Sequence, residues 1–119
     1  MTRTTEEVFD DHLKALQRRD VAAIVIDYTD DVLVLTSQGV LKGRTGVEAF
    51  YRQGFDALPD VEFQIGPRIF GGDALLVCWT ATASAGHVDD GVDTFVFVDG
   101  MIRLQSSSFT IEPNEAGGA

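Results

Sequence analysis

Cysteine and histidine are scarce in this chain, and their scarcity excludes several kinds of site. The 119 residues include one cysteine, Cys78, so no disulfide can form within the chain, and we expect a reducing, cytoplasmic environment. The two histidines, His12 and His87, fall in different predicted elements, which argues against a zinc site. No stretch has the spacing of a phosphate-binding loop or of a serine nucleophile turn. We therefore expect no metal and no cofactor.

Basic residues and long apolar runs are also few. Nine Lys and Arg residues against nineteen Asp and Glu residues give a net charge of −10, which argues against a nucleic acid or an anionic membrane as partner. No apolar run is long enough to span a membrane, and residues 1–11 are too polar for a signal peptide. The length and the hydrophobic content of 45% predict a single domain over residues 1–119, ordered over about 5–111.

Three segments have helical patterns, and the first contains a histidine on its apolar side. Residues 5–18 place Val8, Phe9, Leu13 and Leu16 on one stripe, with His12 inside it. A histidine there is either a packed residue with one backbone partner or a functional group. Asp20 is a suitable N-cap for a second helix over residues 21–27, which we expect to be well buried because it is apolar on nearly all sides.

The third helix follows residues 41–43. Thr45 and Glu48 have the spacing of a capping box at its start, and residues 58–60 end it. Before this helix, residues 32–36 form a short predicted strand that leads into a turn at residues 37–39. After it, four predicted strands cover residues 61 to about 111, joined by short turns, and residues 112–119 form a polar tail that we expect to be mobile.

One of these strands, residues 91–98, contains a carboxylate among apolar side chains. Asp93, Phe95 and Phe97 are two residues apart and point to one face, while valines and a threonine point to the other. If Asp93 faces a covered side, the apolar surroundings raise its pKa. If it lies at the frayed start of the strand, it is solvated or caps a turn. The Asp99-Gly100 pair then predicts a tight hairpin to the next strand.

The order of elements predicts an α+β fold in which helices cover one face of a curved antiparallel sheet. The strands over residues 74–85 and 92–98 are apolar on both faces, whereas three helices cover only one. We therefore expect a homodimer formed through the outer face of the sheet. The pattern does not distinguish which face of residues 74–85 lines the interior.

The chain resembles the nuclear transport factor 2-like superfamily, whose members have a cone-shaped α+β fold. Within that superfamily it is most similar to the SnoaL-like branch of polyketide cyclases and ketosteroid isomerases. The resemblance covers residues 5–111. The motifs that carry it are Arg-Asp-Val at 19–21, Asp-Tyr-Thr-Asp-Asp-Val at 27–32, Leu-Lys-Gly-Arg-Thr-Gly-Val at 41–47, Asp-Thr-Phe-Val-Phe at 93–97 and Asp-Gly-Met-Ile at 99–102. These motifs are mainly structural, so they indicate the fold more closely than the activity.

The resemblance implies roles for three side chains. Asp93 falls where the isomerases hold a protonated Asp that donates a hydrogen bond to the substrate oxyanion. His12 falls at the position of their oxyanion-hole Tyr, and Thr36 at that of the Asp that shuttles the proton. Because Thr is no general base at neutral pH, the resemblance does not extend to isomerase activity itself. The cyclases of this fold also use an acidic residue and a His, so His12 and Asp93 could form such a pair.

Three functional hypotheses follow. In the first, the cone is an enzyme site for an isomerase, cyclase or dehydratase, with Asp93 and His12 as catalytic residues. In the second, the same cavity binds a small apolar molecule without chemistry. In the third, the cavity is filled and the protein is a dimeric interaction module. The residues that we expect to line the ligand site are Tyr28, Thr36, Tyr51, Phe55, Trp79, Phe95 and Ser107. An open cavity with His12 and Asp93 in contact favours the first hypothesis, and an open cavity without that contact favours the second.

Overall fold

Three helices and seven strands form the described part of the chain, residues 2–115 of the computed structural model. The helices are α1 (Thr5–Gln17), α2 (Val21–Val25) and α3 (Gly43–Ala57). The strands are β1 (Tyr28–Thr36), β2 (Gly39–Lys42), β3 (Glu62–Gly71), β4 (Ala74–Thr82), β5 (Gly86–Val98), β6 (Met101–Ser108) and β7 (Glu112–Pro113). The predicted α+β class is confirmed.

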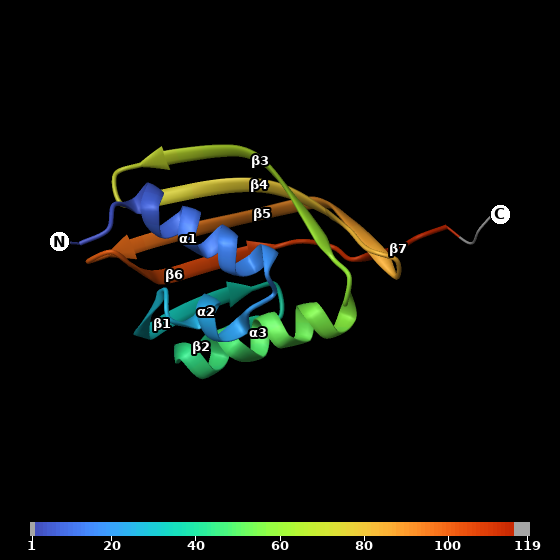
Figure 1. Cartoon of the computed structure of the whole chain (residues 1–119), viewed down its shortest axis with the longest axis horizontal. Helices are drawn as coiled ribbons and strands as arrows, with labels where there is room; N and C mark the ends of the chain where they lie inside the picture. Colours follow the sequence, from blue (N-terminus) through green and yellow to red (C-terminus); the bar gives the residue numbers. More distant parts are fainter. Residues whose placement is uncertain (1, 116–119) are drawn as a thin grey trace.

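The strands form one curved, unclosed sheet in the order β2-β1-β6-β5-β4-β3, and β7 pairs with the start of β5. Strands β3 to β6 run as an antiparallel meander, whereas β1 pairs with β6 in parallel. The sheet is therefore antiparallel as predicted except at the β1–β6 pair, which makes it mixed. The parallel pair arises because α3 carries the chain from the β1–β2 hairpin to the far edge, from which the meander returns to β1 (Figure 1).

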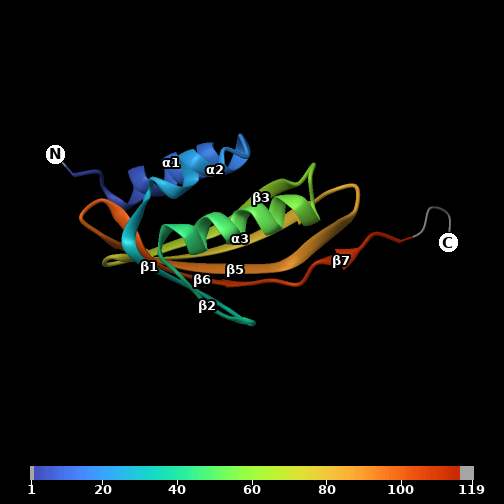
Figure 2. The same ribbon diagram turned by 90° about the horizontal axis from the view of Figure 1, so that it is seen from below.

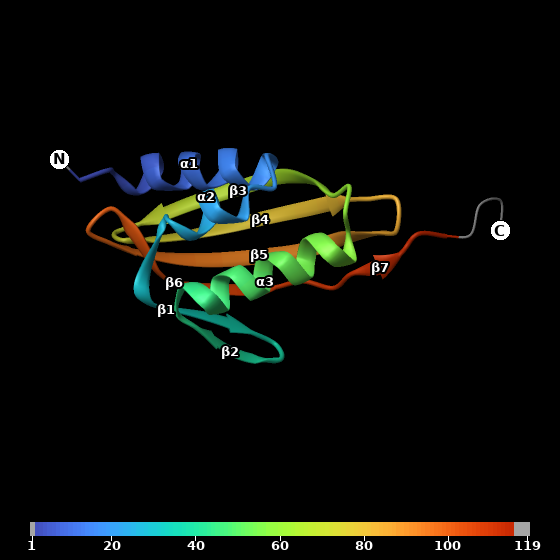
Figure 3. The same cartoon turned by 60° about the horizontal axis from the view of Figure 1, so that its bottom comes forward.

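All three helices lie on the same side of the sheet, and the core fills the space between them and the strands (Figure 2). Figure 3 shows α1 along the β3–β4 half of this face and α3 along the β1–β6 half. Helix α3 contacts β1 and β2, which fixes its position at that end. None of the helices within residues 2–115 is long and apolar enough to cross a membrane.

Two predictions about helix ends and burial need correction. Helix α3 begins at Gly43, and Lys42 caps it without a side-chain hydrogen bond, so Thr45 and Glu48 form no capping box there. Glu48 instead accepts a hydrogen bond from Arg52, four residues on, at 2.9 Å. Helix α2 is shorter than predicted, and of its residues only Ile24 is buried, because the helix packs at the rim rather than inside.

The strand boundaries also differ from the prediction at several places. Strand β1 starts at residue 28 rather than 32, and β4 ends at residue 82 rather than 85. Strand β2 was not predicted, because four residues after a turn carry little pattern. Strand β5 starts at residue 86 rather than 91, and β6 ends at residue 108 rather than 111. Residues 112–113, assigned to a mobile tail, form β7 against residues 86–87 of β5. The rest of that predicted tail, residues 116–119, lies outside the described residues.

The outer face of the sheet is apolar and is not covered by any of the described residues. The side chains at alternate positions of β1, β4 and β5 point away from the helices, and each is 37% or 38% exposed: Leu33, Leu35, Leu76, Val92 and Val98. Their neighbours along each strand, such as Leu75 and Val77, point into the core and are buried. The inner face of β4 is therefore the one that carries Leu75, Val77 and Trp79.

Candidate functional site

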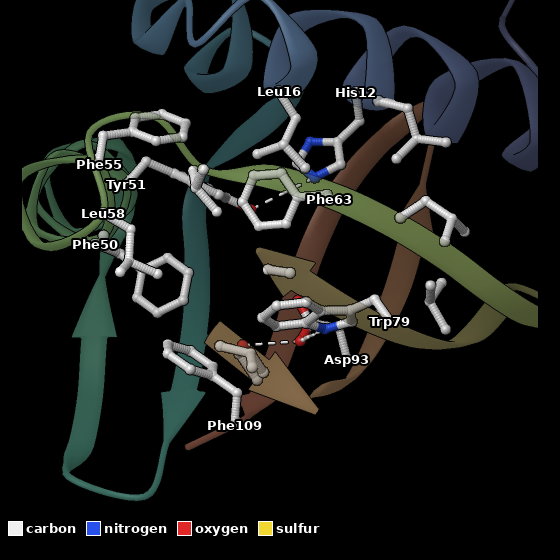
Figure 4. A pocket seen from close by; sticks show the side chains of 18 of the residues that line it. His12, Leu16, Phe50, Tyr51, Phe55, Leu58, Phe63, Trp79, Asp93 and Phe109 are labelled. Atoms are coloured by element: carbon white, nitrogen blue, oxygen red, sulfur yellow. Dashed lines mark hydrogen bonds between the residues drawn. The ribbon is translucent and has the colours of Figure 1, made fainter. Parts of the chain in front are cut away.

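A cavity of about 100 Å³ opens between α1, α3 and the inner face of the sheet (Figure 4). Its walls are mostly aromatic and aliphatic, and the aromatic side chains come from five different elements and from the segment after β6. They are Phe9, Phe50, Tyr51, Phe55, Phe63, Trp79, Phe95 and Phe109. Three polar side chains that can hydrogen-bond a ligand join them: His12, Asp93 and Ser107.

Asp93 lies on the floor of this cavity and is only 9% exposed. Its position follows from the alternation along β5, which turns Asp93, Phe95 and Phe97 inward. Ser107 lies directly opposite on β6 and donates a hydrogen bond to Asp93 Oδ1 at 2.8 Å. Gln105, two residues earlier on the same face of β6, donates from Nε2 to Oδ2 at 2.9 Å. Two successive inward-facing residues of β6 thus donate hydrogen bonds to the two oxygens of the carboxyl group.

Trp79 supplies a third donor, and Gly91 makes room for it. Trp79 and Gly91 are cross-strand partners on β4 and β5. A Cβ atom at Gly91 would lie 2.3 Å from the indole ring, so any other residue there would displace it. With glycine at this position the indole lies across β5 and reaches Asp93, where Nε1 donates to Oδ1 at 3.0 Å (Figure 4).

Burial and hydrogen bonding act on Asp93 in opposite directions. Removal from water raises the pKa of the carboxyl group because it disfavours the charged form. The hydrogen bonds from Ser107, Trp79 and Gln105 lower it, because they stabilise the carboxylate. Burial is the larger effect, so the pKa of Asp93 is raised above its usual value. The sequence-based expectation of a raised pKa for an inward-facing Asp93 agrees with this direction.

A chain of hydrogen bonds leads from Asp93 toward α1. Gln105 is fully buried, and its Nε2 also donates to the Tyr51 hydroxyl at 3.2 Å. The Tyr28 hydroxyl donates to Gln105 Oε1 and lies 3.1 Å from the Tyr51 hydroxyl. The Tyr51 hydroxyl lies 3.4 Å from His12 Nε2. Burial raises the pKa of both tyrosines, so both remain protonated hydroxyls.

His12 occupies the middle of the buried stripe of α1 and is 2% exposed. Its ring lies among Phe9, Tyr28, Tyr51 and Phe95, with ring centroids 5.4 to 6.1 Å away. Burial lowers its pKa to about 4, so the imidazole is neutral at pH 7. Its Nδ1 atom is buried and has no hydrogen-bond partner among residues 2–115. Leaving such an atom unpaired costs about 1–3 kcal/mol.

The structure brings most of the predicted site residues together, but not all in the expected way. Tyr51, Phe55, Trp79, Phe95 and Ser107 line the cavity with His12 and Asp93. The expected direct contact between His12 and Asp93 does not occur among the described residues, because Tyr51 and Gln105 lie between them.

Two predicted ligand-binding residues do not line this cavity. Tyr28 is completely buried behind it, where its hydroxyl bonds to Tyr51 and Gln105. Thr36 lies at the end of β1, where its hydroxyl donates to the Gly39 carbonyl at 3.1 Å, and it lines a neighbouring groove instead.

Gln105 is the polar residue that the sequence prediction missed. It lies two residues before Ser107 on the same predicted strand, so period-2 alternation places both on one face. That signal was available, because Ser107 was itself assigned to the cavity. Four aromatic wall residues were also missed as ligand contacts, although Phe9 was predicted to lie on the apolar stripe of the first helix: Phe9, Phe50, Phe63 and Phe109.

One group of side chains in the described part of the chain could hold a metal ion, and it lies outside the cavity. His87, Asp89 and Glu112 bring ligand atoms within 4.8 Å of one another where β7 pairs with β5. His87 Nδ1 lies 2.9 Å from the side-chain oxygen of Asn114. The sequence did not predict this group because Glu112 was assigned to a mobile tail.

Comparisons with known proteins agree with the fold. No curated protein matches the sequence. AclR, a proposed hydroxylase from Streptomyces galilaeus, is 16% identical with a TM-score of 0.77, over 92% of this chain and 80% of that one. TerC, co-crystallised with polyporic acid, is 18% identical with a TM-score of 0.77, over 89% and 91%.

A proposed ketosteroid isomerase from Kribbella flavida is 17% identical with a TM-score of 0.75, over 96% of this chain and 84% of that one. At these identities the likeness shows the shared fold alone. The family model of the SnoaL-like domain matches residues 9–105, which include most of α1, the whole of α3 and Asp93, whereas Ser107 and Phe109 lie beyond the match. The chain's fold is that of the nuclear transport factor 2-like proteins of known structure, and the chain therefore belongs to the SnoaL-like domain family.

Proposed function

We propose that this protein binds a small, largely apolar molecule in the cavity and that Asp93 exchanges a proton with it. The observation that carries the proposal is a buried carboxyl group in a wall that is otherwise almost entirely apolar. Three side chains donate hydrogen bonds to this carboxyl, although a core that served stability alone could be filled by apolar residues instead. Sites of this composition, with few polar groups among aromatic walls, are typical of small-molecule binding.

The hydrogen bonds to Asp93 favour a general base. Indole and amide N–H groups can only donate, so Trp79 and Gln105 require both carboxyl oxygens to accept. Burial moves the pKa of Asp93 upward, toward pH 7, and a general base is most efficient when its pKa lies near the working pH. We expect Asp93 to take a proton from a carbon or hydroxyl next to a carbonyl group, and His12, as a neutral imidazole, to hydrogen-bond the ligand oxygen. Isomerases, cyclases and dehydratases all use such a step.

The structural neighbours make this class of chemistry reasonable without establishing it. One is proposed to be a ketosteroid isomerase, and another was crystallised with polyporic acid. Because His12 and Asp93 are not in contact, the sequence-based criterion favours binding without chemistry, and the catalytic step rests on Asp93 alone. The experiment must therefore distinguish the two.

Proton exchange on 2-indanone in D₂O tests the proposal. We expect the wild-type protein to accelerate the loss of the methylene proton signals by about 10²–10⁴, the contribution of a placed general base. Asp93→Asn should return the rate to that of buffer, whereas Asp73→Asn, an exposed carboxylate in the β3–β4 turn, should leave it unchanged. Trp79 is the only tryptophan, so its indole N–H signal reports binding separately. If 2-indanone shifts the indole signal but its proton exchange is not accelerated, the binding part of the proposal is supported and the catalytic part is refuted.

We also propose that two copies of the chain pair through the outer face of the sheet. Five aliphatic side chains are partly exposed there, and none of the described segments covers them. A standard interface would bury on the order of 800 Å² per partner. The expectation of no nucleic acid or membrane partner, and of a cytoplasmic location, rests on the charge of −10 and on the single cysteine.

A further inference from the structure

The cavity is small for the ligands that such sites usually bind. Its volume of about 100 Å³ is below the roughly 150 Å³ of an engineered apolar cavity that binds benzene, so it accommodates at most one ring. Binding sites for drug-sized molecules are typically about 300–1,000 Å³. A ligand of more than one ring must therefore extend beyond the cavity.

A groove of about 560 Å³ adjoins the cavity between α3, the β1–β2 hairpin and the segment after β6. Five residues line both spaces, so the groove continues from the cavity: Phe50, Gly54, Ser107, Phe109 and Ile111. Phe50 and Phe109 meet at this boundary with 6.5 Å between their ring centroids, and Figure 4 shows them on facing sides.

The groove differs in chemistry from the cavity. The polar side chains that line the groove but not the cavity are hydroxyls and amides: Thr36, Ser37, Gln38 and Gln53. No charged side chain lines the groove among the described residues. Hydroxyls and amides can pair with neutral donors and acceptors, but they offer no partner for an ionic group. The net charge of −10 further disfavours an anionic ligand.

We infer that the ligand is an elongated, uncharged molecule, with an apolar ring in the cavity next to Asp93 and a hydroxyl-, ether- or amide-bearing extension in the groove. The inference rests on the proposed function, because it uses the same cavity. It assigns Thr36 to the extension rather than to the reacting end. Gly54 lies where the ring and the extension would join.

Gly54 allows the junction to be blocked without disturbing the fold. A Cβ atom added there meets no atom within 4 Å, and the residue lies inside α3, where leucine is a better helix former than glycine. Gly54→Leu should therefore fold and place its side chain at the junction. Gly71→Leu is the matched control, since Gly71 also has open space and lines neither the cavity nor the groove.

Two probes that share a phenyl ring test the inference, with the Trp79 indole N–H signal as the readout. Anisole carries the ring with a methyl ether only, and diethylene glycol monophenyl ether extends that ether by a neutral ether and hydroxyl chain. We expect wild-type protein and Gly71→Leu to bind the longer ether at least about tenfold more tightly than anisole. Gly54→Leu should reduce this ratio to near one while anisole still binds. Gln53→Ala changes the groove alone and should weaken only the longer ether, by a few fold.

The possible failures are distinguishable. Equal affinities of the two probes for the wild-type protein, or an unchanged ratio in Gly54→Leu and Gln53→Ala, would overturn the inference and leave the proposed function intact. If neither probe shifts the Trp79 signal, cavity binding itself is wrong, and the inference is wrong with it. If Gly54→Leu loses both probes because leucine fills the cavity, the ratio of the two affinities in Gln53→Ala decides instead: a reduced ratio supports the inference, and an unchanged ratio overturns it.

Discussion

Replacing His12 by leucine should change the pH dependence of stability by a predictable amount. Burial lowers the pKa of His12 from 6.5 to about 4. Between these values the imidazole is protonated in the unfolded chain and neutral in the folded one, so the unfolded chain binds more protons. The free energy of unfolding therefore falls as the pH falls from 6.5 to 4. A shift of this size corresponds to about 3 kcal/mol, since one pKa unit is about 1.4 kcal/mol.

Leucine abolishes this dependence and also removes the unpaired Nδ1 atom. At pH 7 we expect His12→Leu to be as stable as the wild type or more stable, by up to about 1–3 kcal/mol, because no buried polar atom is left without a partner. At about pH 4.5 the wild type should have lost most of the 3 kcal/mol, so the advantage of the variant widens. The raised pKa of Asp93 acts with the opposite sign, but it is present in both proteins and cancels in the difference.

Urea unfolding at pH 7 and at about pH 4.5, followed by far-UV circular dichroism, measures the effect. His87→Gln is the control, because it removes the only other histidine, which is at the surface, and should retain the dependence caused by His12. The same pH dependence in His12→Leu and in the wild type would refute the argument that His12 is buried and neutral. In the exchange assay with 2-indanone, His12→Leu should also lose activity, as expected for a residue that contacts the ligand.

Four further predictions follow from the geometry. Gly91→Ala should destabilise the fold by about 1–3 kcal/mol and shift the fluorescence of Trp79, because its Cβ would lie 2.3 Å from the indole. Gly86→Ala should detach β7, seen as faster amide exchange there, because its Cβ would lie 2.7 Å from a β7 carbonyl oxygen. Sedimentation at micromolar concentration should show a dimer that Leu76→Lys dissociates, and a wild-type monomer would refute the interface. The carboxyl titration of Asp93 should lie above 3.8, and a value typical of a solvated carboxyl would contradict its burial.

Side-chain periodicity was sufficient to predict the elements that carry a strong pattern. The alternation around Asp93 and Phe95 identified a strand and one of its faces, and the stripe around His12 identified the buried side of α1. Periodicity carries no information about β7, which forms through backbone pairing of two residues with β5. It also carries none about the direction of β1 relative to β6, because that depends on the path of the chain through α3 and the meander.

The contacts of the site were harder to predict than its members. His12 and Asp93 were both expected in the cavity, and both line it. Which group pairs with which depends on distances across three elements, and the pattern of a single strand or helix does not contain them. Gln105 illustrates the point, because its amide contacts Asp93 and Tyr51 from a position that alternation marks only as inward.

The geometry around Asp93 finally bears on the roles that the resemblance to ketosteroid isomerases implies. There the corresponding carboxyl is a protonated donor, and a separate Asp transfers the proton. In this chain Thr36, at the position of that second Asp, lines the groove rather than the cavity. Asp93 accepts hydrogen bonds from Trp79, Gln105 and Ser107, an environment that favours the ionised form as far as burial allows. We therefore expect Asp93 to take the role of the base, while the neutral His12 keeps the implied role of hydrogen-bonding partner of the ligand oxygen.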